Sequence, residues 1–413
     1  MKDTKPFKIS KHVVMEAYKR VKANRGSAGV DHQSLKDFAK DLKKNLYKIW
    51  NRMSSGTYFP PAVKQVEIPK ADEGIRKLGI PTVSDRVAQM VAKLYLEPKL
   101  EPIFHDNSYG YRPNRSPLQA IERAREMCFK YSYVVEFDIK GLFDNIDHDL
   151  LMKVVRKHTS QNWIILYIER WLKAPFQMVD GKMIKRKSGT PQGGVISPLL
   201  SNLFLHYTFD VWMERNYPRS PFERFADDGI VHCNFNEEAR EIMASLERRF
   251  LECKLEIHPI KSKIVYCKDG KRKWDHPNTK FNFLGYEFRA RTCKSSKRII
   301  PFVGFTPGVS REAKKKLMDK IRSLKIQVRT DSSLEDIRKL LNPILTGWIN
   351  YFGVYTKSAM YGVLRMVNLV ILRWARRKFK RFGRSLKQAR KWLRRIYELN
   401  PNLSSHWKVV FQM

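Results

Sequence analysis

The chain has 413 residues, of which 43% are hydrophobic and 12% aromatic, so it can build two or three domains with cores and is not a disordered chain. Its formal net charge is +39, with 80 Lys and Arg against 41 Asp and Glu, which predicts a polyanionic partner such as nucleic acid. The five cysteines show no zinc or disulfide spacing, and no signal peptide or bilayer-spanning segment is present, so we expect a cytoplasmic protein with no membrane partner.

The N-terminal part is expected to be mainly helical, interrupted by a β-hairpin over residues 63–80. Ser84 and Asp85 offer N-caps for a helix through Leu100. Further along we expect a helix over 117–129, an apolar strand over 133–139, helices over 148–158 and 161–173, a hairpin around 180–181 and a helix over 198–215. Next come two short strands within 222–235, a helix over 236–252, and strands over 254–258, 264–267 and 281–288. This order predicts an α+β fold on an antiparallel sheet.

After Pro307 the pattern becomes helical, with helices expected over 310–329, from Ser333, over 358–380 and over 385–397. Residues 371–395 contain twelve Lys or Arg, no Asp or Glu, and interspersed aromatic residues. This pattern predicts a basic amphipathic helix with its aromatic residues toward a core and its cations toward phosphate, although a charge run alone is also typical of a solvated face. The domain boundary is expected near 290–310.

Two acidic sites are the strongest chemical signal in the chain. Asp138 ends an apolar strand, Asp227 and Asp228 lie in the segment Arg-Phe-Ala-Asp-Asp-Gly, and the Gly/Pro-rich segment 189–198 lies between them. Two strand-borne carboxylate sites suit a polymerase that holds two Mg²⁺ ions, with Mn²⁺ as a possible substitute. Asp138 and Asp227 would bridge the ions, Asp228 would support them, and the Ile139 carbonyl would complete a ligand shell. A plain hairpin turn is the alternative reading of Asp-Asp-Gly by itself.

Several segments resemble a known family. Residues 137–148, 189–202 and 224–228 are similar to the core motifs of bacterial group II intron reverse transcriptase/maturases. Further similar segments are 76–86, 108–116, 282–286 and 341–352. The resemblance implies a right-hand polymerase. Its domains would be an N-terminal extension with helical fingers and part of the palm (1–130), an antiparallel-sheet palm with the catalytic site (131–300) and an α-helical thumb, or maturase, RNA-binding domain (301–413).

The resemblance also implies roles for single residues. Asp138, Asp227 and Asp228 match the catalytic metal-binding triad, and Lys261 matches a lysine proposed to protonate the leaving pyrophosphate. Position 260 is Ile where the family usually has Glu, and Lys263 competes with Lys261 for this role.

The implied nucleotide site contains Lys70 and Arg76, which would clamp the triphosphate, and Phe143, which would exclude a ribose 2′-hydroxyl. Gln192 would touch the incoming nucleotide, and Gly193 would let the backbone approach the template. The candidates for contact with nucleic acid are Arg112, Arg115, the primer-grip residues Phe283, Leu284 and Gly285, and the cations Arg373, Arg376, Arg377 and Lys378.

The expected function is that of an RNA-directed DNA polymerase that uses dNTPs, an RNA template and a DNA or RNA primer. It would also bind group II intron RNA to assist splicing and retrotransposition, in the bacterial cytoplasm and, on target DNA, at the nucleoid. The chain stops near Trp407 without the Cys-paired nuclease domain of many relatives, so second-strand cleavage is not expected. Two alternatives stay open: an RNA-binding splicing factor with dispensable polymerase activity, and a domesticated reverse transcriptase in phage defence or CRISPR-associated spacer acquisition.

Overall fold

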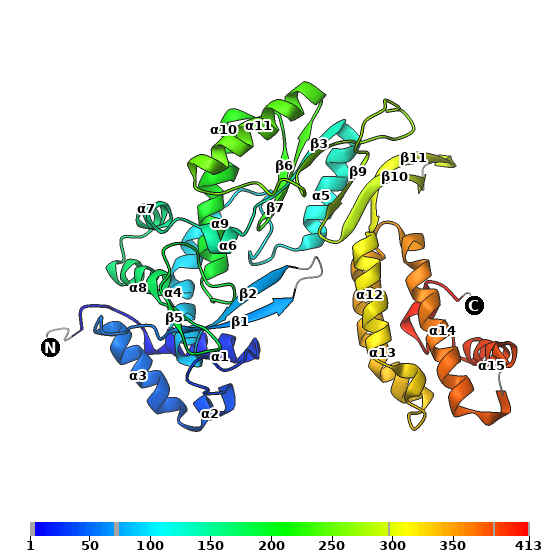
Figure 1. Cartoon of the computed structure of the whole chain (residues 1–413), viewed down its shortest axis with the longest axis horizontal. Coiled ribbons are helices and arrows are strands. Elements are labelled where there is room, and N and C mark those ends of the chain that lie inside the picture. Colours follow the sequence, from blue (N-terminus) through cyan, green and yellow to red (C-terminus); the bar gives the residue numbers. More distant parts are fainter. Residues whose placement is uncertain (1–4, 70–73, 296–297, 383–384, 412–413) are drawn as a thin grey trace. The chain divides into compact units, whose positions relative to one another are not determined.

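The computed structural model describes residues 5–69, 74–295, 298–382 and 385–411. The chain divides into two compact units, each with its own core. The first consists of Met1–Ala120, Val135–Val231 and Asn236–Lys263, and the second of Ile121–Val134, His232–Phe235 and Ile264–Met413. Helices and strands occur in both units, so the expected mixed α+β class is confirmed (Figure 1). Within the described ranges, no helix has the length and apolar character needed to cross a membrane.

The first unit contains most of the helices expected from the sequence. They are α1 (Lys11–Ala23), α2 (Leu35–Lys40), α3 (Leu42–Ser54), α4 (Val83–Leu100), α6 (Leu142–Asn145), α7 (His148–His158), α8 (Asn162–Lys173), α9 (Ser197–Leu205), α10 (Val211–Asn216) and α11 (Asn236–Glu252). Helix α5 (Pro117–Lys130) begins in this part of the chain. A π-helical turn, His206–Asp210, joins α9 to α10.

The predicted N-cap of α4 was wrong. The helix begins two or three residues earlier than Ser84 or Asp85 would place it, because Thr82 adopts an extended backbone and its side chain accepts a hydrogen bond from the Asp85 amide. Thr is itself a favoured N-cap residue, so the signal was present two residues upstream.

Two four-stranded sheets are formed by strands between Val63 and Tyr266. The first has the order β2-β1-β4-β5, with β1 (Val63–Pro69), β2 (Ile75–Ile80), β4 (Phe176–Gln177) and β5 (Met183–Ile184). The second has the order β6-β7-β3-β8, with β3 (Tyr133–Asp138), β6 (Phe222–Phe225), β7 (Asp228–Cys233) and β8 (Lys263–Tyr266). Strand β3 lies inside this sheet, as its apolar sequence predicted. The expected strand over 254–258 was wrong, since this segment forms only a single bridge between Ile257 and Ile139.

The second unit combines an antiparallel sheet with helices. The sheet has the order β11-β10-β9, with β9 (Lys280–Phe283), β10 (Tyr286–Ser295) and β11 (Arg298–Val309). The helices are α12 (Arg311–Ser323), α13 (Leu334–Phe352), α14 (Tyr361–Lys378) and α15 (Leu386–Leu399). The helix expected over 310–329 ends early because Lys325 takes a left-handed backbone with φ +47°, after which a short 3-10 turn, η3 (Ile326–Val328), follows.

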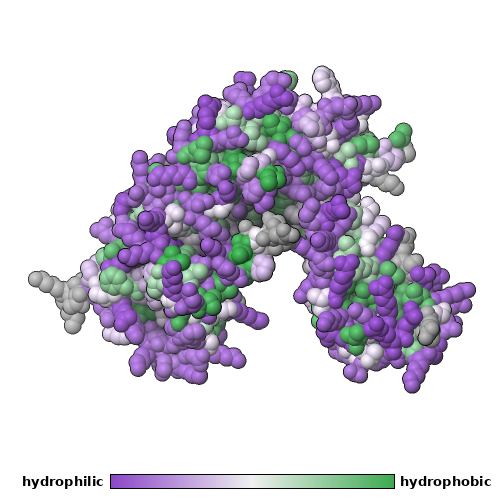
Figure 2. Space-filling model, in the orientation of Figure 1, coloured by the Kyte–Doolittle hydropathy of each residue, from purple (hydrophilic) through white to green (hydrophobic). Residues whose placement is uncertain are grey.

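The helices of the second unit share a core centred on α14. Val367, Ile371 and Trp374 of this helix are buried with Leu393 of α15. Asn368, also on α14, accepts hydrogen bonds from the ring nitrogens of His406 and Trp407, which fixes the C-terminal segment on the same core. Hydrophilic residues cover most of the visible face of each unit (Figure 2).

Candidate active site

The acidic residues lie at the ends of two neighbouring strands. Asp138 is the last residue of β3, Asp227 lies in the turn between β6 and β7, and Asp228 is the first residue of β7. The Ile139 amide donates a hydrogen bond to the Asp227 carbonyl at 3.3 Å, which joins the two segments at this point. The backbone of Ala226 is left-handed, with φ +59°, and tightens the turn. The local fold therefore brings the three carboxylates together at one end of the sheet.

These carboxylates interact strongly. Burial raises the pKa of Asp228 to about 7, with further contributions from the charges of Asp227 and Asp138 and from a hydrogen bond with Asp138. Burial also raises the pKa of Asp227, as does the charge of Asp138, whereas Arg76 and Lys261 lower it. Like charges in a shared site disfavour ionisation, so a cation bound here would relieve a real electrostatic cost.

The donor set is chemically suited to hard divalent cations. Carboxylate and carbonyl oxygens are the ligands that Mg²⁺ and Mn²⁺ prefer. Within the described residues, no group of three or more His, Cys, Asp or Glu side chains stands in a ready-made metal-binding arrangement. The fit therefore rests on the type of donor and on the mutual repulsion of the carboxylates.

Lys261 lies beside the acidic centre. Its Nζ atom is 3.3 Å from Asp138 Oδ2. Two hydrogen bonds hold the segment that carries Lys261 beside the end of β3. The Asp138 carbonyl accepts one from the His258 amide at 2.8 Å, and the Asp138 amide donates the other to Ser262 Oγ at 3.2 Å. Lys263 instead pairs with Glu136, at 3.4 Å. Of the two competing lysines, Lys261 is therefore the one placed next to Asp138.

The expected nucleotide-binding residues come from several elements. Arg76 is exposed on β2, and its charge acts on Asp227 and on Tyr111. Lys70 lies outside the described residues. Phe143, on α6, is half-buried, with its ring 6.3 Å from that of Tyr111 in an edge-on arrangement.

The Gly/Pro-rich segment is held against β2. The Gly79 amide donates to the Gln192 carbonyl at 2.8 Å, and the backbone of Gly193 has φ +121°. A Cβ atom at Gly193 would lie 2.4 Å from the Gly79 carbonyl oxygen, so the close approach seen for this glycine is to the β2 backbone. The backbone amide of Val195 donates to the Gln89 side chain on α4 at 2.8 Å, which fixes the other end of the segment.

Tyr111 is a site residue that the sequence reasoning did not single out. Its backbone is left-handed, with φ +57°, and its ring lies between those of Phe143 and Phe225 at 6.3 and 6.5 Å. Burial and the charge of Asp227 raise its pKa. The preceding residue, Gly110, packs directly against the backbone of Ala226. Any larger residue would clash there, since a Cβ atom at position 110 would lie 2.4 Å from the Ala226 amide nitrogen. Tyr111 lies in segment 108–116, which resembles the family motif, but only Arg112 and Arg115 of this segment were selected as candidates.

Arg224 is the second residue that was missed. Its guanidinium is fully buried and makes a two-pronged ion pair with Asp210, at 2.7 and 2.8 Å. It also donates to Ser108 Oγ, to the Asn202 side chain and to the Ala226 carbonyl. Burial alone would raise the pKa of Asp210, but the charge and hydrogen bonding of Arg224, together with the contribution of His206, outweigh it and the pKa is lowered. Arg224 thus anchors the acidic turn to the π-helical segment.

Arg112, which was expected to contact phosphate, already has partners within the protein. Its side chain is 4% exposed, pairs with Glu101 at 2.8 Å and donates to the carbonyls of His105 and Ser108. These partners occupy the guanidinium and give it a structural role. Arg115 is more accessible but pairs with Asp106 at 2.7 Å.

The residues expected to form a primer grip lie in the second unit, at the end of β9 and in the turn before β10. Phe283 is buried, and Leu284 and Gly285 both have positive φ. The Leu284 carbonyl accepts from the Tyr351 hydroxyl of α13 at 2.9 Å, and the Gly285 carbonyl accepts from the Ser310 amide at 3.0 Å. The turn is therefore rigidly held by its own unit.

The basic residues of α14 differ in their accessibility. Arg373 and Arg377 are exposed. Arg376 is half-buried, and its Nε atom has no hydrogen-bond partner among the residues that the structure describes. Lys378 donates to the Thr330 carbonyl at 2.8 Å. Two of these four cations therefore point to solvent.

A known protein family matches more than half of the chain. Residues 68–288 match the family "Reverse transcriptase (RNA-dependent DNA polymerase)", and the chain belongs to this family. Residues 314–400 match the "Group II intron, maturase-specific domain", which places the chain among the reverse transcriptases that carry a group II intron maturase domain.

Individual relatives agree with this assignment. The chain is 34% identical over 217 residues to the group II intron-encoded protein LtrA of Lactococcus lactis subsp. cremoris, covering 51% of this chain and 36% of that protein. It is 30% identical over 312 residues to protein YkfC of Escherichia coli K12, covering 66% and 78%. It is 30% identical over 206 residues to the putative COX1/OXI3 intron 1 protein of Saccharomyces cerevisiae, covering 49% and 24%. The chain thus spans about a third of the length of LtrA.

Proposed function

We propose that the chain is an RNA-directed DNA polymerase that extends a DNA or RNA primer with dNTPs on an RNA template and binds group II intron RNA to assist splicing and retrotransposition. The observation that carries the proposal is the convergence of Asp138, Asp227 and Asp228 at one end of the β6-β7-β3-β8 sheet, with Lys261 beside them. The family and the maturase-specific match support it.

Two Mg²⁺ ions, when bound, would supply the charge neutralisation that activates a primer hydroxyl and stabilises the leaving phosphates. Asp138 and Asp227 would hold both ions, Asp228 would support them, and the Ile139 carbonyl would add a neutral ligand. Mn²⁺ would fit the same oxygen donors. The repulsion among the carboxylates, seen as the raised pKa of Asp228, supports this assignment.

Lys261 would deliver a proton to the leaving pyrophosphate. A lysine ammonium carries protons that it can donate to an oxygen on which negative charge develops. Its position 3.3 Å from Asp138 supports Lys261 over Lys263, whose partner is Glu136.

The nucleotide would lie between the acidic centre and the aromatic rings. Arg76 would offset the triphosphate charge together with Lys70, and Gln192 and Gly193 would border the nucleotide on the side of β2. Phe143 would exclude a 2′-hydroxyl, and the neighbouring Tyr111 ring would limit its movement.

The proposed division into fingers (1–130), palm (131–300) and thumb (301–413) follows the family. In this division, the primer grip at Phe283, Leu284 and Gly285 is a positioning device, and Arg373 and Arg377 are the accessible phosphate contacts of the thumb. The proposed setting is the bacterial cytoplasm. The maturase-specific match favours an intron function over phage defence or spacer acquisition.

Primer extension on an RNA template tests the proposal. The Asp227→Ala variant should lose dNTP incorporation, whereas Asp331→Ala, which removes an exposed carboxylate from a turn of the second unit, should keep it. Retained incorporation by Asp227→Ala would exclude the proposed site. Splicing by the same variant would show whether RNA binding is independent of catalysis, as a splicing factor with a dispensable polymerase requires.

A further inference from the structure

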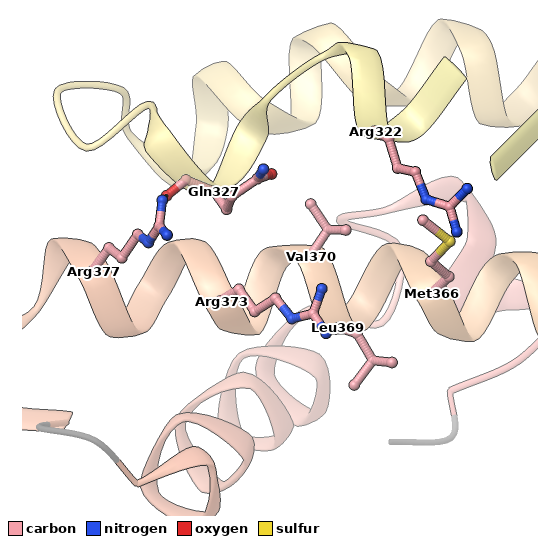
Figure 3. Close-up of a pocket in the computed structure, with 7 residues that line it drawn as sticks. All are labelled: Arg322, Gln327, Met366, Leu369, Val370, Arg373 and Arg377. Atoms are coloured by element: carbon pink, nitrogen blue, oxygen red, sulfur yellow. The ribbon is translucent and has the colours of Figure 1, made fainter. Parts of the chain in front are cut away.

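A groove on the second unit has the composition of a nucleotide-binding site. It is lined by Arg322, Gln327, Met366, Leu369, Val370, Arg373 and Arg377 and has a volume of about 510 Å³ (Figure 3). We call it the α14 groove. Helix α14 supplies one side, and the C-terminal end of α12 with η3 supplies the other. Its volume lies within the range of small-ligand pockets, roughly 300–1,000 Å³.

The floor of the α14 groove is apolar. Met366, Leu369 and Val370 follow each other at helical spacings of three and four residues, so their side chains form a continuous stripe on one face of α14. Val370 is only 5% exposed and is part of the core, whereas Met366 and Leu369 are half-buried. The stripe is therefore anchored in the core by Val370, and Met366 and Leu369 leave apolar surface exposed that a ligand can cover.

The charged residues that line the groove are all arginines. Arg373 lies one turn after the stripe and makes no hydrogen bond or ion pair in the part of the chain that the structure describes. Arg377 donates to the Gln327 carbonyl at 3.4 Å, which links α14 to η3. Arg322 pairs with the exposed Asp319 at 2.7 Å and keeps further N–H donors for a ligand.

This combination fits a base and its phosphate together. A base offers a flat face to an apolar surface, and its phosphate offers oxygen acceptors to guanidinium groups. An apolar peptide would cover the floor but leave the arginine walls without partners. A base stacked inside a duplex could not reach the floor, because both of its faces are already covered.

We propose that the α14 groove binds one unstacked nucleotide of an RNA strand, a role that rests on the proposed RNA-binding function of the chain. The base covers Met366 and Leu369, the Gln327 amide reaches the base edge, and the adjoining phosphate binds Arg373. The groove thus distinguishes RNA with an unpaired base from continuous duplex, which a diffuse basic surface does not.

The test compares two RNA hairpins of equal length, one with a single bulged 2-aminopurine and one fully paired. The full chain, without dNTPs, should bind the bulged hairpin about tenfold more tightly, and the 2-aminopurine fluorescence should change on binding. Arg373→Gln should reduce this preference to about twofold or less. Leu369→Ser should reduce it while leaving the salt dependence of binding unchanged, since it removes no charge.

The matched control is Arg390→Gln on α15, which removes the same charge from an exposed position that does not line the groove. It should weaken binding of both hairpins equally and keep the preference. Equal binding of the two hairpins by the wild-type chain, or the same preference in Arg373→Gln and Arg390→Gln, would overturn the inference. This assay measures RNA binding and not polymerisation. A negative result would therefore overturn the proposed α14 groove without bearing on the polymerase site, which primer extension tests.

Discussion

Replacing Asp228 by asparagine should stabilise the protein at alkaline pH while abolishing polymerisation. The pKa of Asp228 rises on folding from its ordinary 3.8 to about 7, because burial and the neighbouring Asp227 and Asp138 disfavour its charge. The folded chain therefore binds this proton more readily than the unfolded chain, and stability falls as pH rises from about 4 to about 7. The loss is complete above pH 7.

The magnitude follows from the size of this interval. About three pH units at about 1.4 kcal/mol each give a ceiling of about 4 kcal/mol for the cost of ionising Asp228 in the metal-free protein. Asp228 also hydrogen-bonds Asp138, and the asparagine keeps part of this interaction, so Asp228→Asn should raise the free energy of unfolding by about 1–3 kcal/mol at pH 8. At pH 4 the wild-type carboxyl is already protonated and the gain should vanish.

Urea denaturation at pH 4, 6 and 8, without divalent ions, measures this difference. Asp331→Asn is the control, because it removes an exposed carboxylate from a turn of the second unit and should show no such pH profile. Added Mg²⁺ should stabilise the wild type more than Asp228→Asn, since the variant keeps only two of the three carboxylates proposed to hold the ions. A variant less stable than wild type at pH 8, or a gain that does not shrink on acidification, would refute the reasoning.

Three further outcomes are expected. Arg224→Met should lower the free energy of unfolding by about 3–5 kcal/mol because it leaves Asp210 buried without its arginine partner, and adding Asp210→Leu should restore part of this loss in urea denaturation. A double variant no more stable than the single one would contradict this. Phe143→Ala should lower the ratio of kcat/KM for dNTPs to that for ribonucleotides by roughly tenfold or more, and an unchanged ratio would remove its proposed role. Lys261→Gln should reduce kcat by about 10²–10⁴, whereas Lys263→Gln should change it less than about tenfold; the reverse order would reassign the proton donor.

The sequence by itself predicted the elements whose signals are local. The hairpins at 63–80 and around 180–181, the central strand β3 and the helices of both units follow from hydrophobic periodicity, turn residues and capping, which act within a few residues. The acidic residues could also be selected, because paired carboxylates at strand ends have few other uses. The early end of α12 escaped because it depends on the left-handed backbone of Lys325, and the single bridge at Ile257 escaped because its partner, Ile139, is distant in the chain.

The tertiary structure decided which side chains meet. Lys261 and Lys263 have the same chemistry in the sequence, and only their partners, Asp138 and Glu136, distinguish them. Arg112 was expected from the sequence to contact phosphate and Arg224 was not singled out, yet both are buried and paired with a carboxylate inside the protein. Charge is a property of a residue, whereas burial and pairing are properties of neighbours distant in the chain, and these are set only when the chain packs.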